Sequence, residues 1–153
     1  LLNENHSITY NMITDYWKDT GTPEDIIHAN KAILENLTPD FRGQKESTVS
    51  LEGNVSVGKN TLIKNRVKIK GPVIIGNNCK IYGETTIGPN TSIGNECVIS
   101  GGKIEDTIIM DNCEIEINGN IRNSIISSNS SIKQNSTQDE QIFLLGEGTK
   151  ILF

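Results

Sequence analysis

The sequence predicts a mainly β protein in which a parallel β-helix of six-residue repeats, about five coils long, follows a short strand and one α-helix. Two observations predict the β-helix. Branched aliphatic residues recur at every sixth position from Leu51, and asparagine or glycine recurs at fixed places between them. A third observation, a capped helix pattern that starts at Thr22, predicts the helix.

The opening of the chain supplies the strand and the helix. Residues 8–13 (ITYNMI) have the apolar pattern of an edge strand. Thr22, followed by Pro23 and then by Asp25, is typical of a helix start: a cap, a first-turn proline and an acid that reaches back. The predicted apolar face of this helix comprises Ile26, Ala29, Ile33 and Leu37, with Ile27 and Leu34. Pro39 and Gly43 end the pattern, so we expect one unit over residues 1–43 and the β-helix over residues 44–153.

The aliphatic repeat defines the strands of the β-helix. It runs unbroken through Leu51, Val57, Ile63, Ile69, Ile75, Ile81, Ile87, Ile93 and Ile99. A small or β-branched residue stands two positions before each of these, so every repeat offers two inward side chains on one short strand. With eighteen residues per coil, the side chains stack in three ladders about 4.8 Å apart: Leu51, Ile69 and Ile87; Val57, Ile75 and Ile93; Ile63, Ile81 and Ile99.

Turn residues support the same repeat. A corner every six residues needs backbone conformations that glycine and asparagine tolerate. Three positions after the aliphatic residues stand Asn54, Asn60, Asn78, Asn90, Asn112, Asn118, Asn129 and Asn135. After Ile99 the spacing slips once, by ten residues, to Ile109, and we therefore expect residues 100–107 (SGGKIEDT) to form a protruding loop.

Composition excludes several classes of function. The net charge is −5 and the 14 basic residues are scattered, so the chain has no basic stripe for nucleic-acid phosphates, and we expect no DNA or RNA partner. There is neither a long apolar run nor a charged-then-apolar leader, so we expect no membrane partner and a cytoplasmic location.

The three cysteines are odd in number and lack metal-ligand spacing, which argues against a disulfide framework and a zinc site. Cys79 and Cys97 are eighteen residues apart, so we expect them to stack beside Thr61 as small apolar residues. Cys113 is expected in the same kind of position on a different face.

The hexad pattern closely resembles left-handed hexapeptide β-helix proteins, and the predicted handedness rests on this resemblance because crossover rules alone favour a right-handed coil. Many of these proteins are acyltransferases, and the resemblance implies for them a histidine base between neighbouring subunits. The repeats contain no histidine, since the two in the chain are His6 and His28. Acyl transfer is therefore disfavoured, although a carboxylate base stays open.

A second resemblance is more specific. The stretch YWKDTGTPEDIIHANKAIL (16–34) resembles the end of the catalytic domain of sugar-1-phosphate nucleotidyltransferases. The stretch IGPNTSIGNECVISGGKIEDTIIMDNCEI (87–115), with the closing LLGEGTKILF (144–153), resembles the β-helix appended to the long form of glucose-1-phosphate thymidylyltransferase. This resemblance implies that the chain is the C-terminal part of such an enzyme, without the larger half that holds the nucleotide-binding loop.

The resemblance also implies roles for three residues. Asp19 would be a carboxylate ligand of the catalytic Mg²⁺, Trp17 would lie beside the sugar pocket, and Gly21 would permit the tight turn into the helix. A cation held in this way offsets the repulsion between a nucleoside triphosphate and a sugar 1-phosphate, the two substrates. The residues alone favour a plainer interpretation, in which Asp19 accepts hydrogen bonds in a turn and Trp17 is a packing anchor.

The predicted function is therefore a contribution to NDP-sugar formation, with dTDP-glucose as the expected product of the longer enzyme. Whether this chain has activity by itself stays open, because the nucleotide-binding half is lacking. Its β-helix is expected to serve assembly and regulation, as a homotrimer or a higher homo-oligomer. The alternatives are a free-standing structural or regulatory β-helix and, less favoured, an acyltransferase.

Overall fold

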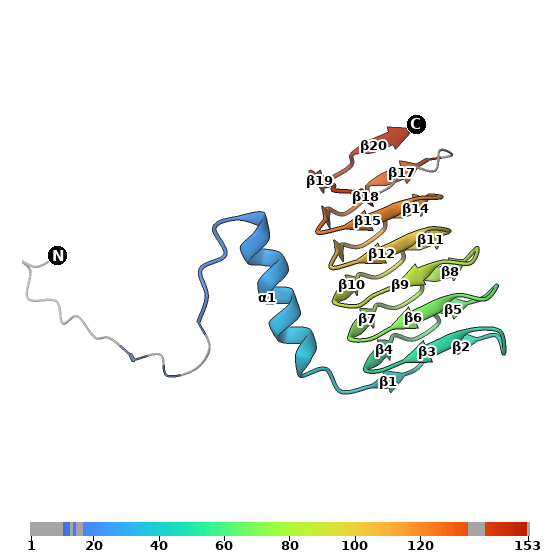
Figure 1. Ribbon diagram of the computed structural model, residues 1–153, viewed down its shortest axis with the longest axis horizontal. Coiled ribbons are helices and arrows are strands. Elements are labelled where there is room, and N and C mark those ends of the chain that lie inside the picture. The colour runs from blue at the N-terminus through green and yellow to red at the C-terminus, as the bar shows by residue number, and fades with distance from the viewer. Residues whose placement is uncertain (1–10, 13, 15–16, 135–139, 153) are drawn as a thin grey trace, which may run out of the picture.

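The computed structural model describes residues 11–12, 14, 17–134 and 140–152. Within these residues one helix, α1 (Pro23–Glu35), precedes twenty short strands. The strands are wound into a solenoid with three faces, and α1 lies alongside one of these faces (Figure 1). The parallel β-helix with one preceding helix is thus confirmed.

Each face of the solenoid is one parallel sheet. Sheet A contains β1 (Asp40–Phe41), β4 (Val55–Val57), β7 (Val73–Ile75), β10 (Thr91–Ile93), β13 (Ile108–Ile109), β16 (Ile125–Ile126) and β19 (Leu144–Leu145). Sheet B contains β2 (Gln44–Lys45), β5 (Leu62–Ile63), β8 (Lys80–Tyr82), β11 (Val98–Ser100), β14 (Glu114–Glu116), β17 (Ser131–Lys133) and β20 (Lys150–Leu152). Sheet C contains β3 (Ser50–Glu52), β6 (Lys68–Lys70), β9 (Thr86–Ile87), β12 (Lys103–Glu105), β15 (Asn120–Arg122) and β18 (Glu140–Gln141).

The solenoid has about six coils, one more than the sequence predicted, because sheets A and B have seven strands each and sheet C has six. The additional strands come from both ends of the repeat. At the beginning, β1 already pairs with β4, so the solenoid starts at Asp40, before the expected boundary at residue 44. Of the strand expected over residues 8–13, residues 8–10 and 13 lie outside the described residues, and Asn11 and Met12 belong to no strand.

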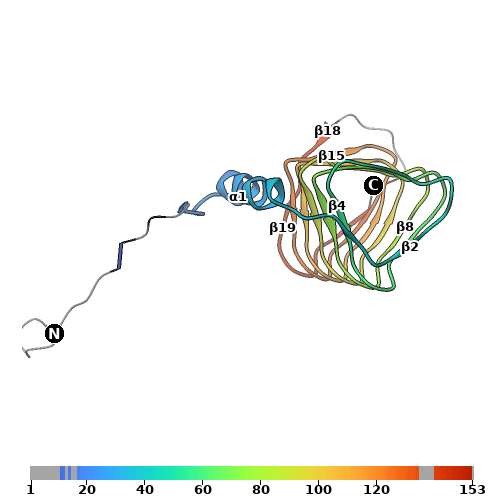
Figure 2. The ribbon, with the colours of Figure 1, turned by 90° about the horizontal axis from the view of Figure 1, so that it is seen from below.

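The coil is left-handed. Figure 2 views the solenoid from below, so the first coils are nearest and the last are farthest away. The chain passes from sheet A on the left (β4, β19) to sheet B on the right (β2, β8) and then to sheet C at the top (β15, β18). This path runs counterclockwise as it recedes, which defines a left-handed coil.

The three predicted ladders form the core. Ile75 pairs with Val57 below it and Ile93 above it in sheet A. The corresponding ladders are Leu51, Ile69 and Ile87 in sheet C and Ile63, Ile81 and Ile99 in sheet B. All of these side chains are buried except Leu51, which is partly buried in the outermost coils. Full burial of one such side chain contributes about 1.5–3 kcal/mol, so these repeated contacts are the main source of stability.

Residues 100–107 do not protrude, and the predicted loop is wrong. Ile104, on β12, is fully buried between Ile87 and Ile121 in sheet C. The slip of ten residues is therefore two steps of five, from Ile99 to Ile104 and from Ile104 to Ile109. Gly101 and Gly102, with φ of +76° and +66°, make the tighter corner between β11 and β12. The prediction searched for an aliphatic residue at every sixth position and therefore missed Ile104, which lies five residues from both Ile99 and Ile109.

Asparagine marks many of the corners, as predicted. Five of the expected positions have φ between 55° and 62°: Asn60, Asn78, Asn90, Asn112 and Asn129. Asn54 and Asn118 do not have a positive φ, and Asn135 lies outside the described residues. Asparagines on neighbouring coils also bond to each other, as in the 2.7 Å hydrogen bond from Asn112 Nδ2 to Asn129 Oδ1. The corner residues therefore serve both the left-handed backbone and the stacking of coils.

Helix α1 begins as predicted but packs with a different face. Thr22 is the N-cap and Pro23 the first helical residue. Ile27 and Leu34 are buried, whereas Ile26 is partly exposed and Ile33 is 73% exposed. The predicted apolar face therefore divides: Ile27 and Leu34 are buried, Ala29 and Leu37 are partly buried, and Ile26 and Ile33 are exposed.

Candidate functional site

The opening segment presents the residues to which the resemblance gives roles. Asp25 N donates a 3.2 Å hydrogen bond to Thr22 Oγ1, and Thr22 Oγ1 donates one of 2.7 Å to Asp25 Oδ2. Lys18 Nζ lies 3.1 Å from the other oxygen of Asp25. These hydrogen bonds, first that from Thr22 and then that from Lys18, lower the pKa of Asp25. Trp17, just before this capped turn, is 69% exposed, so in this structure it is not a packing anchor.

Asp19 and Gly21 lie on the same exposed stretch. Among the described residues no three His, Cys, Asp or Glu side chains come together to hold a metal ion, and Asp25 is engaged by Thr22 and Lys18. The Asp19 carboxylate by itself does not complete a Mg²⁺ site, which needs further oxygen ligands. Gly21 does not have a positive φ, and an added Cβ would meet only Asp19 Oδ1 at 3.8 Å.

Polar side chains of α1 and of the solenoid form a junction that joins the two parts of the structure. Asn30 Oδ1 accepts a 2.6 Å hydrogen bond from Ser92 Oγ on β10, and Asn30 Nδ2 donates one of 3.3 Å to the carbonyl oxygen of Asn90. Ile27 and Leu34 pack one turn before and one turn after this contact. The helix thus docks on sheet A with a polar centre between two apolar contacts, and the polar groups determine its register.

The buried carboxylate of Asp106 forms an ion pair with Lys31, the helix residue that follows Asn30. Lys31 Nζ lies 2.9 Å from Oδ1 of Asp106, to which Asn90 Nδ2 also donates at 2.9 Å. Arg122 Nε lies 3.2 Å from Oδ2 of Asp106, and Arg122 Nη1 lies 3.6 Å from Glu140 Oε2. Because the Asp106 residue is only 6% exposed, it joins α1 to two neighbouring coils from inside the junction.

These contacts keep Asp106 ionised. Burial by itself raises the pKa of this carboxyl, but hydrogen bonds from Lys31, Asn90 and Arg122 outweigh burial and hold the pKa below its ordinary value. The junction therefore needs the charged form of Asp106.

Sequence reasoning missed this junction, because Asp106 belongs to the stretch predicted to be a loop. A signal was nevertheless present. Asp106 takes the corner position that Asn90 takes on the preceding coil and Asn123 on the following coil, and all three have a positive φ. Asparagine is sufficient for this backbone conformation, so the negative charge of an aspartate is not needed by the corner itself. The charge indicates that Asp106 binds a cationic side chain elsewhere in the fold.

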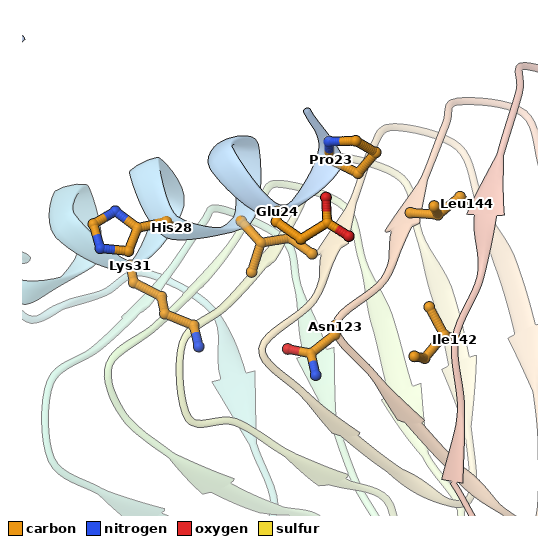
Figure 3. Close-up of a pocket in the computed structure, with 8 residues that line it drawn as sticks. Pro23, Glu24, His28, Lys31, Asn123, Ile142 and Leu144 are labelled. Carbon is orange, nitrogen blue, oxygen red and sulfur yellow. The ribbon is translucent and has the colours of Figure 1, made fainter. Parts of the chain in front are cut away.

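A cavity of about 410 Å³ opens beside the junction, between α1 and the last coils. Four apolar residues line it: Pro23, Ile27, Ile142 and Leu144. Four polar residues complete the lining: Glu24, His28, Lys31 and Asn123. Figure 3 shows Glu24 and Lys31 on the helix and, on the solenoid opposite, Leu144 of β19 with Asn123 and Ile142 from the segments between strands. This arrangement is that of a small binding site with one apolar and one polar side.

The cysteines form a column inside the solenoid. Each thiol donates to a carbonyl oxygen of the next coil: Cys79 to Gly94 at 3.1 Å, Cys97 to Met110 at 3.1 Å and Cys113 to Ser127 at 3.2 Å. Thr61 begins the same column, as predicted, and its Oγ1 bonds the carbonyl oxygen of Gly76 at 2.7 Å.

Cys113 therefore belongs to the column of Cys79 and Cys97, and its predicted place on a different face is wrong. The two five-residue steps shorten that coil from eighteen residues to sixteen, which brings Cys113 above Cys97. Hydrogen bonding with Cys113 and Cys79, together with burial, raises the pKa of the Cys97 thiol. All three thiols are free and buried, as small apolar residues would be.

Across the described part of the chain, no helix has the length and apolar character needed to cross a membrane.

Comparison with known proteins identifies the chain's relatives. Low-salt glycan biosynthesis nucleotidyltransferase Agl11 of Haloferax volcanii is 31% identical over 132 residues, which are 86% of this chain and 37% of that protein. Glucose-1-phosphate thymidylyltransferase of Streptomyces antibioticus is 32% identical over 65 residues, 42% of this chain and 18% of that protein. Bifunctional protein GlmU of Methanocaldococcus jannaschii is 34% identical over 50 residues, 33% of this chain and 12% of that protein.

The chain thus spans well under half the length of these curated relatives. The resemblance to the C-terminal hexapeptide-repeat region of sugar-1-phosphate nucleotidyltransferases is confirmed by these matches. The family described as GMPPB C-terminal domain matches residues 69–152, more than half of the chain and most of the solenoid. The chain belongs to the GMPPB C-terminal domain family.

Proposed function

We propose that the chain is the C-terminal portion of a nucleotidyltransferase that forms an NDP-sugar, with dTDP-glucose as product, from a nucleoside triphosphate and a sugar 1-phosphate. One observation carries this proposal. The match to the haloarchaeal nucleotidyltransferase covers 132 residues of this chain, more than the solenoid contains, so it includes part of the segment that precedes β1. That segment holds the capped turn and α1, which the resemblance assigns to the end of a catalytic domain.

Pyrophosphate release tests the reaction. The longer protein that contains this chain, supplied with thymidine triphosphate and glucose 1-phosphate, should release pyrophosphate faster than with other pairs of nucleotide and sugar 1-phosphate. The 153-residue chain by itself should release none, because its described residues provide neither a metal cluster nor a complete catalytic site. Preference for another pair would contradict the assigned product, and no activity with any pair would contradict the reaction class. Acetyl transfer by the chain to an amino-sugar phosphate would favour the acyltransferase alternative.

We propose further that Asp19 supplies one carboxylate to a catalytic Mg²⁺ in the longer protein, and that Trp17 lies beside the sugar there. Both side chains are exposed on this chain, which leaves them available to a catalytic domain. Asp19→Asn keeps the size but removes the charge, so turnover should fall by orders of magnitude while the solenoid stays folded. Trp17→Ala should raise KM for the sugar phosphate. Asp40→Asn is a control, since Asp40 pairs with Arg42 on the surface at 2.9 Å and should leave turnover unchanged.

The role proposed for the solenoid is assembly and regulation of the enzyme as a homotrimer or higher homo-oligomer. Open strand edges at both ends of the solenoid and its flat faces are surfaces that neighbouring subunits can cover. Sedimentation equilibrium should give three or more times the monomer mass, whereas a monomer at micromolar concentration would contradict this proposal. A cytoplasmic location is also proposed, and the three free cysteines support it because reducing compartments keep thiols unpaired.

A further inference from the structure

We propose that the cavity between α1 and the last coils binds a neutral, hydroxyl-rich small molecule of monosaccharide size. The cavity of about 410 Å³ lies within the range typical of small-molecule sites. It is formed entirely by residues of this chain, so the proposal does not depend on nucleotidyl transfer.

One wall of the cavity is apolar without serving the solenoid core. Ile142 is 62% exposed and Leu144 is 54% exposed, although both are large aliphatic residues. Leu144 lies on β19 and Ile142 just before it. Pro23 and Ile27 line the same cavity from the helix. A smaller hollow of about 190 Å³ shares Pro23 and Leu144 and extends this wall toward Ile125. Burying this surface under the apolar face of a ligand ring removes it from water, which favours binding.

The other wall offers hydrogen-bonding groups that are not already in use. Among the described residues, the side chains of Glu24, His28 and Asn123 have no hydrogen bond or ion pair with another side chain or with the backbone. A carboxylate accepts two or more hydrogen bonds, and an amide both donates and accepts. Glu24 lines the cavity from the helix and Asn123 lines it from the solenoid (Figure 3), so a ring held between them can bond its hydroxyl groups to both sides.

The charges around the cavity indicate a neutral ligand. Lys31 is compensated by Asp106 at 2.9 Å, and Arg122 is compensated by Asp106 and by Glu140 at 3.6 Å. Glu24 then adds a negative charge, so the surroundings carry no surplus positive charge for a phosphate. The ion pair with Asp106 also holds Lys31 in place, so the polar wall is organised before a ligand arrives.

Isothermal titration calorimetry on the full 153-residue chain tests the proposal, with glucose, methyl glucoside and glucose 1-phosphate as probes. Glucose and methyl glucoside should bind with one site per chain, and glucose 1-phosphate should bind at least threefold more weakly. Glu24→Ala should weaken glucose binding about tenfold, the consequence of losing hydrogen bonds to a charged group. Leu144→Asp should weaken it by a similar factor, because it places a charge in the apolar wall.

Glu35→Ala is the matched control, because Glu35 is an exposed glutamate at the other end of the same helix. This variant should bind glucose with the same affinity as the parent. Glu24 and Leu144 are exposed, so both variants should fold, as circular dichroism can verify. The proposal is overturned if neither neutral sugar binds, if the phosphate ester binds more tightly than glucose, or if Glu24→Ala and Leu144→Asp both retain the parent's affinity. Binding only of an apolar peptide would instead identify the cavity as a protein-docking site and also overturn it.

Discussion

Lys31 Nζ lies 2.9 Å from Asp106 Oδ1, so an ion pair joins a helix at the start of the chain to a corner in the middle of the solenoid. The Asp106 side chain is 8% exposed, whereas that of Lys31 is 34% exposed. The carboxylate therefore cannot exchange its partners for bulk water as easily as the lysine can. The position of α1 on sheet A depends on the charge of this one buried group.

Asp106→Asn should loosen α1 on the solenoid. Asparagine accepts the positive φ of this corner, as Asn90 and Asn123 do on the adjacent coils, but it removes the charge that pairs with Lys31 and Arg122. The expected cost is about 1–3 kcal/mol, the range for hydrogen bonds to charged groups. Hydrogen exchange measured by mass spectrometry should show faster exchange in residues 23–35 and unchanged exchange in β7 and β10.

Glu114→Gln is the matched control for that experiment. Its ion pair with Lys133 has the same 2.9 Å separation, but both side chains are largely exposed on sheet B. Exposed pairs contribute about 0–1 kcal/mol, so exchange in α1 should not change. Equal exchange of α1 in Asp106→Asn and in the parent would show that Ile27, Leu34 and the hydrogen bonds of Asn30 hold the helix without the ion pair.

Acid should weaken the same junction. The folded-state pKa of Asp106 is lowered, so its stabilisation is fully present above the ordinary aspartate value of about 3.9 and is lost as pH falls through the lowered pKa. The stability difference between the parent and Asp106→Asn should therefore be largest near pH 6 and should shrink below about pH 4. Urea unfolding followed by circular dichroism at several pH values measures this difference. A difference that grows with acid would contradict the ionised state of Asp106.

Ile104→Ala should destabilise the solenoid as much as Ile75→Ala does. Both side chains are fully buried in continuous ladders, and truncation of such residues costs about 2–5 kcal/mol through lost transfer energy and the remaining cavity. Thermal unfolding of the two variants measures the effect. Ile33→Ala, on the exposed side of α1, is the control and should stay within about 0.5 kcal/mol of the parent. If Ile104→Ala behaved like Ile33→Ala, residues 100–107 would be a loop after all.

The thiol column should be inert in the folded protein. Cys79, Cys97 and Cys113 are buried and bonded to carbonyl oxygens, so a reagent cannot reach their sulfur atoms. Hydrogen bonding with Cys97 lowers the pKa of Cys79 and of Cys113 to about 7 and raises that of Cys97, so burial protects the outer two thiols. Dithionitrobenzoate should therefore react with none of them until guanidinium unfolds the chain, when all three should react. Lys80→Cys places a thiol on the outer side of β8 and should react at once. Prompt reaction of the parent would show that the coils open readily.

The sequence by itself determined the repeating part of this protein. Alternation within a strand and left-handed turns at asparagine are properties of a few consecutive residues, so Val57, Ile75 and Ile93 could be assigned to one ladder without coordinates. The helix start at Thr22 could also be predicted from neighbouring residues alone, because the cap is a hydrogen bond between Thr22 and Asp25, three residues apart. The exposed positions of Trp17 and Asp19 were not decided by the pattern, and their proposed roles rest on a resemblance.

Only the tertiary structure decided where coils shorten and which side of α1 packs. Both Ile27 and Ile33 satisfy a helical apolar pattern. The choice between them is made by the contacts of Asn30 with Ser92 and of Lys31 with Asp106, each between residues more than sixty positions apart. In the same way, the column of Cys113 depends on the length of the preceding coil, which two five-residue steps shorten. The physical reason is common to both cases: repeat position is set by local backbone geometry, whereas docking and stacking are set by partners that only the folded chain brings together.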